Sequence, residues 1–282
     1  MRTPTVSSVA LPRGRRLTVR AWDGDGPPLV LLHGLLDSSE GWDPLARRLD
    51  QPCIAIDLPG FGGSDLPAIP RIEAYAADVA VALEHLAVGP CTLVGHSLGG
   101  GVAALVAEMT PCVRSLVLLA PAGFGRIAIA DILTRPVIVD LATFALPLAL
   151  VNPLTVTAAY TTFVAHRRLP ERDLINRLRR RAARAPYAVR AATIAMAHAG
   201  REERRRIDFG GRVGALWGAH DALVPVTHAD GLREALPQSE IEFWPGMGHH
   251  PQRERPTELA AFVERWADPD GYSYSVSAAS TT

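Results

Sequence analysis

A serine flanked by glycines is the residue of this chain best placed to do chemistry. It is the central residue of Gly95-His96-Ser97-Leu98-Gly99, which follows an apolar strand-like run and precedes a helix-like run. A serine in this context is typical of a nucleophile elbow, a tight turn that exposes the hydroxyl at a strand end. Gly95 and Gly99 lack the Cβ atoms that would collide in such a turn. The alternative is a glycine-rich turn whose serine caps the helix.

A serine hydroxyl becomes a useful nucleophile only when a base removes its proton and a third group orients that base. Two adjacent histidines, His249 and His250, follow the last strand-like run and are candidates for the base, although an exposed loop histidine is the better interpretation of His250. Asp221 lies just beyond the preceding strand-like run, where its carboxylate could accept the Nδ1–H of the base. The alternative for Asp221 is a helix cap. Asp57 also ends a strand-like run, but the glycine-rich sequence after it indicates a structural turn.

Backbone N–H groups are expected to stabilise the negative charge that forms when the serine attacks a carbonyl. Leu98 opens the helix after the serine, and a helix start carries free N–H groups and a partial positive charge. Leu35 follows Gly34 in a loop directly after an apolar strand-like run, and its N–H is expected to pair with that of Leu98 as an oxyanion hole. His33 and His96 are expected to support these loops without titrating in catalysis.

The elements that must position these residues alternate between strand-like and helix-like runs. Such alternation indicates a parallel sheet with right-handed crossovers, and the nearly all-apolar runs indicate strands covered on both faces. We therefore expect an α/β protein with a doubly wound, mostly parallel, eight-stranded sheet that opens with an antiparallel hairpin. The expected strands are Val6–Ala10, Leu17–Trp22, Leu29–His33, Cys53–Asp57, Cys91–Gly95, Ser115–Leu119, Val213–Trp217 and Glu240–Trp244. The expected helices are Pro44–Leu49, Ile72–Leu86, with Asp78 and Glu84 facing outward, Leu98–Met109, Val226–Leu236 and Pro256–Trp266.

The alternation breaks between about residues 123 and 206, where no core-like strand is found and prolines recur. This segment is expected to form a helical cap between the sixth and seventh strands. The expected organisation is a first core part over 1–122, the cap over 123–206, a second core part over 207–268 and a disordered tail over 269–282, which is rich in Ser, Ala and Thr.

The expected cap has an unusual charge distribution. Residues 141–165 include no charged residue, a length that could cross a bilayer, but interrupting prolines favour buried lid helices over a membrane-touching lid. Over 123–206 there are 15 arginines against 6 acidic residues. These arginines are expected to form a solvated face paired with acids of the core. The alternative is that they attract an anionic substrate, an acidic partner or a lipid headgroup.

Overall composition excludes several other classes of function. The formal net charge is zero, so nothing indicates a nucleic-acid partner. All 29 basic residues are arginine, which excludes Schiff-base chemistry on a lysine of this chain. The three cysteines show neither disulfide nor zinc-site spacing and are expected to be small core residues. No apolar signal segment is found at the N-terminus, so the cytoplasm is the expected compartment.

From about residue 15 to 267 the chain resembles α/β-hydrolases, and five ordered motifs carry the resemblance. They are His33-Gly34, Asp57–Ser64, Gly95–Gly100, Gly218–Pro225, and Gly248–Pro251 with Glu254–Pro256. The order Ser97, Asp221, His249 is the order of the triad in this family. The family's base is the histidine of the Gly-His pair, which selects His249 over His250. The resemblance also implies the helical cap and a reaction that needs no metal or cofactor.

The resemblance implies a serine hydrolase that cleaves a carboxylic ester of an apolar small molecule through an acyl-enzyme. Ser97 stands where dehalogenases and epoxide hydrolases of this family carry aspartate, which disfavours those reactions. The loop after His33 lacks the proline of the His-Gly-x-Pro group. Carbon–carbon bond hydrolases of meta-cleavage products are an alternative, weakened because His250 stands where they often have tryptophan. Cofactor-free perhydrolases or haloperoxidases, and a non-catalytic binding or signalling protein, are further alternatives.

Overall fold

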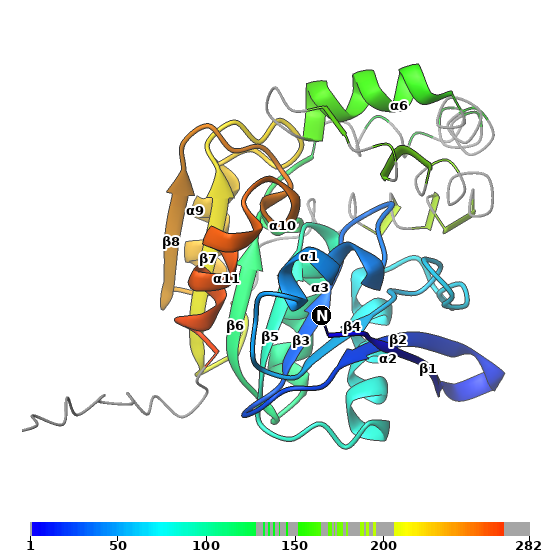
Figure 1. Ribbon diagram of the computed structural model, residues 1–282, viewed down its shortest axis with the longest axis vertical. Coiled ribbons are helices and arrows are strands. Elements are labelled where there is room, and N and C mark those ends of the chain that lie inside the picture. Colours follow the sequence, from blue (N-terminus) through cyan, green and yellow to red (C-terminus); the bar gives the residue numbers. More distant parts are fainter. Residues whose placement is uncertain are drawn as a thin grey trace, which may run out of the picture.

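A computed structural model of the protein describes residues 2–127, 152–164 and 206–267, together with isolated positions between 132 and 195. An eight-stranded sheet with the order β1-β2-β4-β3-β5-β6-β7-β8 forms its centre (Figure 1). The strands are β1 (Thr5–Ala10), β2 (Arg16–Trp22), β3 (Leu29–Leu32), β4 (Cys53–Ile56), β5 (Cys91–His96), β6 (Val113–Leu119), β7 (Arg212–Gly218) and β8 (Ser239–Trp244). Strand β2 pairs antiparallel with β1 and β4, and all other neighbours pair parallel, which confirms the expected sheet and its opening hairpin.

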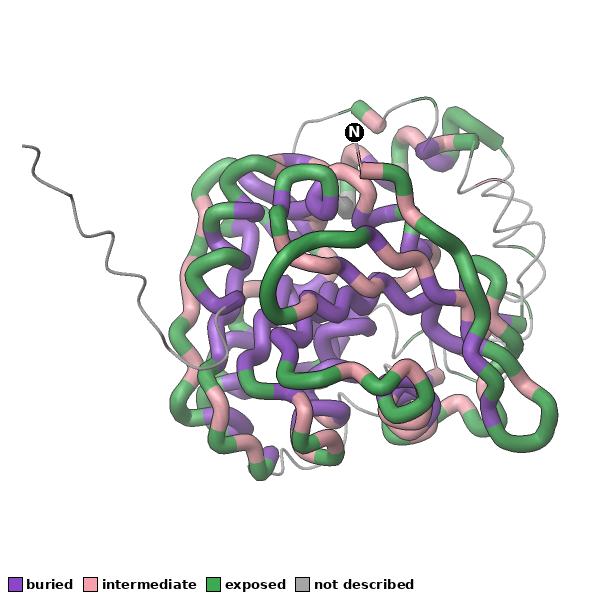
Figure 2. The backbone as a smooth tube through the Cα atoms, turned by 60° about the horizontal axis from the view of Figure 1, so that its bottom comes forward, coloured by how far each residue is buried: buried purple, intermediate pink, exposed green. Residues whose placement is uncertain are grey.

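Alternate side chains of the parallel strands pack into two separate hydrophobic cores, because successive residues of a strand point to opposite faces of the sheet. In β3, Val30 and Leu32 pack with one set of buried residues and Leu29 and Leu31 with the other. The first set includes residues of α2 (Ile72–His85), α3 (Leu98–Met109) and α9 (His228–Ala235). The second includes residues of α1 (Asp43–Ala46) and α11 (Pro256–Glu264). The central strands are thus buried on both faces, and purple segments fill the middle of the tube in Figure 2.

The strand order reverses between β3 and β5, and ligand sites of open α/β sheets lie at such a reversal, beyond the carboxyl ends of the strands. The loop with Gly34 follows β3, and the turn with Ser97 follows β5. Two further strands deliver Asp221 and His249 at the same edge, since β7 and β8 run parallel to β6. The topology therefore gathers all the predicted site residues at one end of the sheet.

Helix α2 departs from the expectation that Asp78 faces outward. Asp78 is buried, and both of its carboxylate oxygens accept hydrogen bonds from the Arg15 guanidinium, at 2.5 and 2.7 Å. Arg15 lies in the turn of the β1–β2 hairpin, so this bidentate pair fastens the hairpin to α2. The prediction was wrong because a polar residue on a helix can be buried when a partner distant in sequence supplies the opposite charge. Glu84 is exposed as expected.

The segment between β6 and β7 is described only in part. It includes α6 (Pro153–Ala159), which the Asn152 side chain caps by accepting the Leu154 N–H, and a π-helical turn at Tyr160–Val164. Figure 1 shows α6 (green) above the core, on the side where α10 (Pro251–Glu254) lies. Most of the expected cap over 123–206 and the tail over 269–282 lie outside the described residues. Among the described helices, none has the length and hydropathy that a membrane span requires.

Candidate active site

Ser97 occupies a strained turn between β5 and α3. Its φ and ψ angles are 53° and −119°, a region that residues other than glycine rarely occupy. The turn is held by its backbone, because the Ser97 N–H donates to Leu119 and the Ser97 carbonyl accepts the Ala122 N–H, each at 2.9 Å. The Ser97 side chain makes no capping hydrogen bond to α3. This geometry matches a nucleophile elbow and contradicts the helix-cap alternative.

The neighbouring glycines are required by close backbone contacts. A Cβ on Gly95 would lie 2.4 Å from the Gly99 carbonyl oxygen, and a Cβ on Gly99 would lie 2.4 Å from the Leu32 carbonyl oxygen. A Cβ on Gly34 would lie 3.0 Å from Cβ of Ser97. The loop after β3 therefore packs directly against the serine, as the oxyanion-hole prediction requires.

Asp221 and His249 form a buried hydrogen bond. His249 Nδ1 lies 2.6 Å from Asp221 Oδ2, and their side chains are 4% and 0% exposed. The other oxygen, Oδ1, accepts the N–H groups of Leu223 and Val224, each at 2.9 Å. Because a carboxylate only accepts, Nδ1 of His249 carries the proton, and Nε2 of the neutral ring keeps an available lone pair. Asp221 does not cap a helix, because α9 begins seven residues later, at His228.

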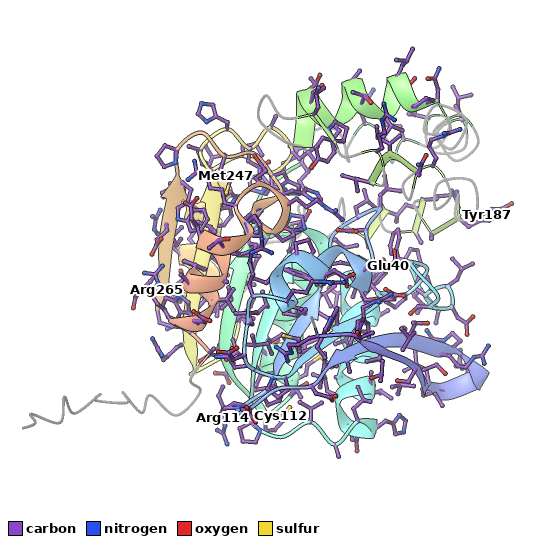
Figure 3. All side chains as sticks on the ribbon, viewed as in Figure 1. Glu40, Cys112, Arg114, Tyr187, Met247 and Arg265 are labelled. Atoms are coloured by element: carbon purple, nitrogen blue, oxygen red, sulfur yellow. The ribbon has the colours of Figure 1, made fainter. Side chains whose placement is uncertain are left out.

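The loops that carry these two residues are packed on each other. The His220 N–H donates to the Met247 carbonyl at 3.0 Å, and a Cβ on Gly218 would lie 2.0 Å from the Gly248 carbonyl oxygen. Met247, labelled in Figure 3, is fully buried in the histidine loop, which is residues 245–250 between β8 and α10 (Pro251–Glu254). The distance between the aspartate and the histidine is thus fixed by backbone contacts as well as by their own hydrogen bond.

Ser97 and His249 are connected through His96. His96 Nε2 lies 2.7 Å from the His249 carbonyl oxygen, and the two rings are 4.7 Å apart. Among the hydrogen bonds of residues 2–127 and 206–267, none joins the Ser97 hydroxyl to His249. In free enzymes this bond is often long and tightens when substrate binds. The structure therefore joins two of the three predicted triad residues directly and holds the third beside them.

The predicted oxyanion donors lie at the ends of adjacent strands. Leu98 is the first residue of α3, so its N–H has no acceptor within the helix. Leu35 follows β3 and is half-buried, and Leu36 beside it has a φ of 60°. The loop after β3 is therefore held in an unusual backbone conformation against the serine turn.

The His33 ring contacts the backbone on both of its sides. The Leu58 N–H donates to His33 Nε2 at 2.9 Å, so Nδ1 carries the proton and donates to the Gly34 carbonyl at 2.8 Å.

Asp57 is structural, as expected, because its carboxylate accepts the N–H groups of Ser39 and Gly63.

The expectation of an exposed His250 was wrong. His250 is half-buried, with its ring edge-on to that of His96 at 4.7 Å and 6.2 Å from that of Tyr160. Burial, together with the neighbouring His96 and His249, lowers the pKa of His250 well below its ordinary value. Tyr160 belongs to the segment between β6 and β7, so His250 lies where that segment meets the core.

Three consecutive residues of the short helix α10 hold three different parts of the site, and no sequence pattern predicted these contacts. Gln252 hydrogen-bonds His96 at 3.2 Å. Arg253 lies 3.2 Å from the carboxylate of Asp37, in the loop after β3. Glu254 accepts the N–H groups of Gly248 and His250 at 2.9 and 3.0 Å, which fixes the histidine loop. The family motif included Glu254, but nothing in the sequence indicated its partners.

The Asp37–Arg253 pair is expected to contribute strongly to stability, because its side chains are only 5% and 11% exposed. Arg253→Met removes the positive charge opposite a buried carboxylate and should lower the free energy of unfolding by about 3 kcal/mol. Urea denaturation measures this change. The control is Arg233→Met, whose ion pair with Asp230 is exposed and should cost no more than about 0.5 kcal/mol. Equal losses in the two variants would contradict the prediction.

His96 is expected to make the protein less stable in acid. Burial is the main cause that lowers its pKa to about 3, so the unfolded chain binds a proton at pH 5 that the folded chain does not. This contribution to stability is complete above about pH 6.5 and is lost as the pH falls, by about 1.4 kcal/mol per unit. Urea denaturation at pH 7 and pH 5 should show a drop that is about 2 kcal/mol smaller in His96→Asn than in the parent. Equal drops would contradict a neutral His96.

Comparisons with known proteins identify the family of this chain. Residues 29–262 match the model of the alpha/beta hydrolase family. The chain belongs to this family. An uncharacterized protein of Mycobacterium tuberculosis is 32% identical over 273 residues, which are 87% of this chain and 76% of that protein.

Two solved structures are similar to this alpha/beta hydrolase. The crystal structure of a membrane phospholipase A, described as a bacterial virulence factor, is 26% identical, has a TM-score of 0.71 and matches 93% of this chain and 85% of its own. An esterase from Exiguobacterium antarcticum has a TM-score of 0.74 at 20% identity over 93% of this chain and 99% of its own, a likeness that shows the fold alone. Membership of the alpha/beta hydrolase family supports hydrolase activity.

Proposed function

We propose that this alpha/beta hydrolase is a serine esterase that cleaves carboxylic esters of apolar small molecules through an acyl-enzyme. The observation that carries the proposal is the buried Asp221–His249 hydrogen bond at the sheet edge where Ser97 adopts the elbow conformation. A phospholipase and an esterase are among the similar structures, and both names describe ester hydrolysis. The proposed nucleophile, acid and base are Ser97, Asp221 and His249.

In the proposed reaction, Ser97 Oγ attacks the ester carbonyl while His249 Nε2 takes its proton. Asp221 stabilises the imidazolium that forms, because its Oδ2 already accepts the Nδ1–H. The N–H groups of Leu35 and Leu98 stabilise the oxyanion. His249 then protonates the leaving alcohol, and afterwards it activates a water molecule that releases the acid and restores Ser97.

The substrate pocket is proposed to lie between the core and a cap formed by residues 123–206. Two described residues of that segment, Val156 and Tyr160, are 2% and 7% exposed, and the Tyr160 ring approaches His250 beside the proposed base. The absence of charged residues from 141 to 165 suits an apolar roof. We therefore propose that the acyl group or alcohol of the substrate is hydrophobic.

The test is steady-state hydrolysis of p-nitrophenyl esters from acetate to palmitate, with Ser97→Ala as the control. The proposal expects turnover with a chain-length optimum, all of it lost in the variant. The length at the optimum would measure the apolar pocket. Turnover no faster than that of Ser97→Ala at every chain length would overturn the esterase proposal. The proposal would also be overturned if the protein turned over a ring-fission diketone, or peroxide, but hydrolysed none of the esters.

A further inference from the structure

A line of buried hydrogen bonds runs from helix α10 to the backbone of the proposed base. The Gln252 side-chain amide lies 3.2 Å from His96 Nδ1, and His96 Nε2 lies 2.7 Å from the His249 carbonyl oxygen. All three residues are at most 3% exposed. They come from α10, from the end of β5 and from the loop after β8.

The positions of the protons along this line follow from the His249 carbonyl, where the line ends. The His249 carbonyl can only accept, so His96 Nε2 must carry a proton and donate it. A neutral ring then leaves Nδ1 as an acceptor, and Gln252 must present its NH₂ group to it. The opposite orientation of the amide would place an oxygen against Nδ1 and would require a second proton on the ring. One arrangement of amide and ring therefore satisfies both hydrogen bonds of the line, while Gln252 Oε1 is buried without a partner among the described residues.

The groups around the His96 ring also favour its neutral form. The charged or titratable groups that face it are His249 and His250 of the histidine loop, Asp37 of the loop after β3 and Arg253 of α10. A proton on Nδ1 would oppose the Gln252 NH₂ group. It would also place a positive charge 4.7 Å from the ring of His249, which itself becomes positive during the proposed reaction.

We propose that Gln252 and His96 are positioning residues that hold the backbone of His249 at a fixed place beside the nucleophile. His96 directly precedes Ser97, so one neutral imidazole joins the serine turn to the histidine loop. Gln252 keeps that imidazole in the tautomer that donates to His249. The inference rests on the proposed function, since it assigns a role in the reaction of Ser97 and His249.

Gln252→Glu tests the donor without changing the shape of the side chain. The glutamate and His96 Nδ1 must share one proton, and loss of that proton at alkaline pH leaves two acceptors facing each other. We expect kcat of Gln252→Glu to gain an alkaline limb between pH 7 and 10 that the parent lacks, with KM within twofold of the parent. Gln252→Met, which has no donor at any pH, should lower kcat about tenfold across the range. Gln238→Glu adds the same charge at an exposed site as a matched control.

A second measurement, ¹⁵N NMR of the imidazole nitrogens, tests the arrangement without turnover. In the parent, His96 should show a protonated Nε2 and a bare Nδ1 from pH 5 to 9, and in Gln252→Glu its Nδ1 should gain proton character. A protonated Nδ1 in the parent would overturn the inference. So would parent-like kcat at every pH in both Gln252 variants when their melting temperatures match the parent. A parent with the expected tautomer but no ester turnover would count against the proposed function and not against the arrangement.

Discussion

Ser97→Ala is expected to lower kcat for p-nitrophenyl butyrate by about 10⁶-fold, because the acyl-enzyme route needs this hydroxyl and the other triad members act only through it. KM and the free energy of unfolding should change little, since the Ser97 backbone holds the turn and its side chain caps nothing. Initial rates at saturating ester, with melting temperature as the fold check, measure both effects.

The matched control for Ser97→Ala is Ser7→Ala, which removes an exposed hydroxyl from β1 and should leave kcat unchanged. His249→Ala should fall to nearly the same level as Ser97→Ala, and the double variant should fall no further, because the two residues act as one unit. A Ser97→Ala enzyme that retains one hundredth of the parent rate would place the nucleophile elsewhere.

Asp221→Asn is expected to lower kcat about 10⁴-fold, the second largest effect, through the tautomer of His249. Oδ1 of Asp221 accepts the N–H groups of Leu223 and Val224, so the oxygen of the new amide should keep that place. Its NH₂ group then faces His249 Nδ1, which must become the acceptor. Nε2 then carries the proton, and the ring can no longer take one from Ser97.

This effect of Asp221→Asn should appear in kcat with little change in KM, because the Asp221 side chain is fully buried. Asp230→Asn, which neutralises an exposed aspartate of α9, serves as the control and should behave like the parent. A loss below tenfold in Asp221→Asn would contradict the assigned orienting role. NMR of the His249 nitrogens would show the tautomer directly.

Much of the fold was predictable because its signals are local. Apolar strand-like runs gave the strands of the sheet to within one or two residues, and α3 begins and ends where its pattern predicted. The glycines around Ser97 and the placement of Asp221 beyond a strand were equally local. These local features predicted the serine turn and the position of the aspartate, and the family pattern then selected His249.

The features that the sequence did not predict depend on contacts between residues that are distant in the sequence. Asp78 is buried because Arg15, 63 positions away, pairs with it, and no helical pattern records such a partner. Helix α10 has only four residues, too few for a periodic signal. The contact of Gln252 with His96 spans 156 positions and exists only after the sheet has gathered its loops. His250 was misassigned for the same reason, since its neighbours come from β5 and from the segment before β7.

The most direct test of the central claim is covalent labelling of the parent protein with a fluorophosphonate, which phosphonylates activated serines. Intact mass should show one adduct per chain, and peptide mass spectrometry should place it on Ser97. Ser97→Ala should show no adduct, and His249→Ala should react at least 10³-fold more slowly because the base is missing. A parent that takes no label, or takes it on another serine, would contradict the assignment of Ser97 as the activated nucleophile.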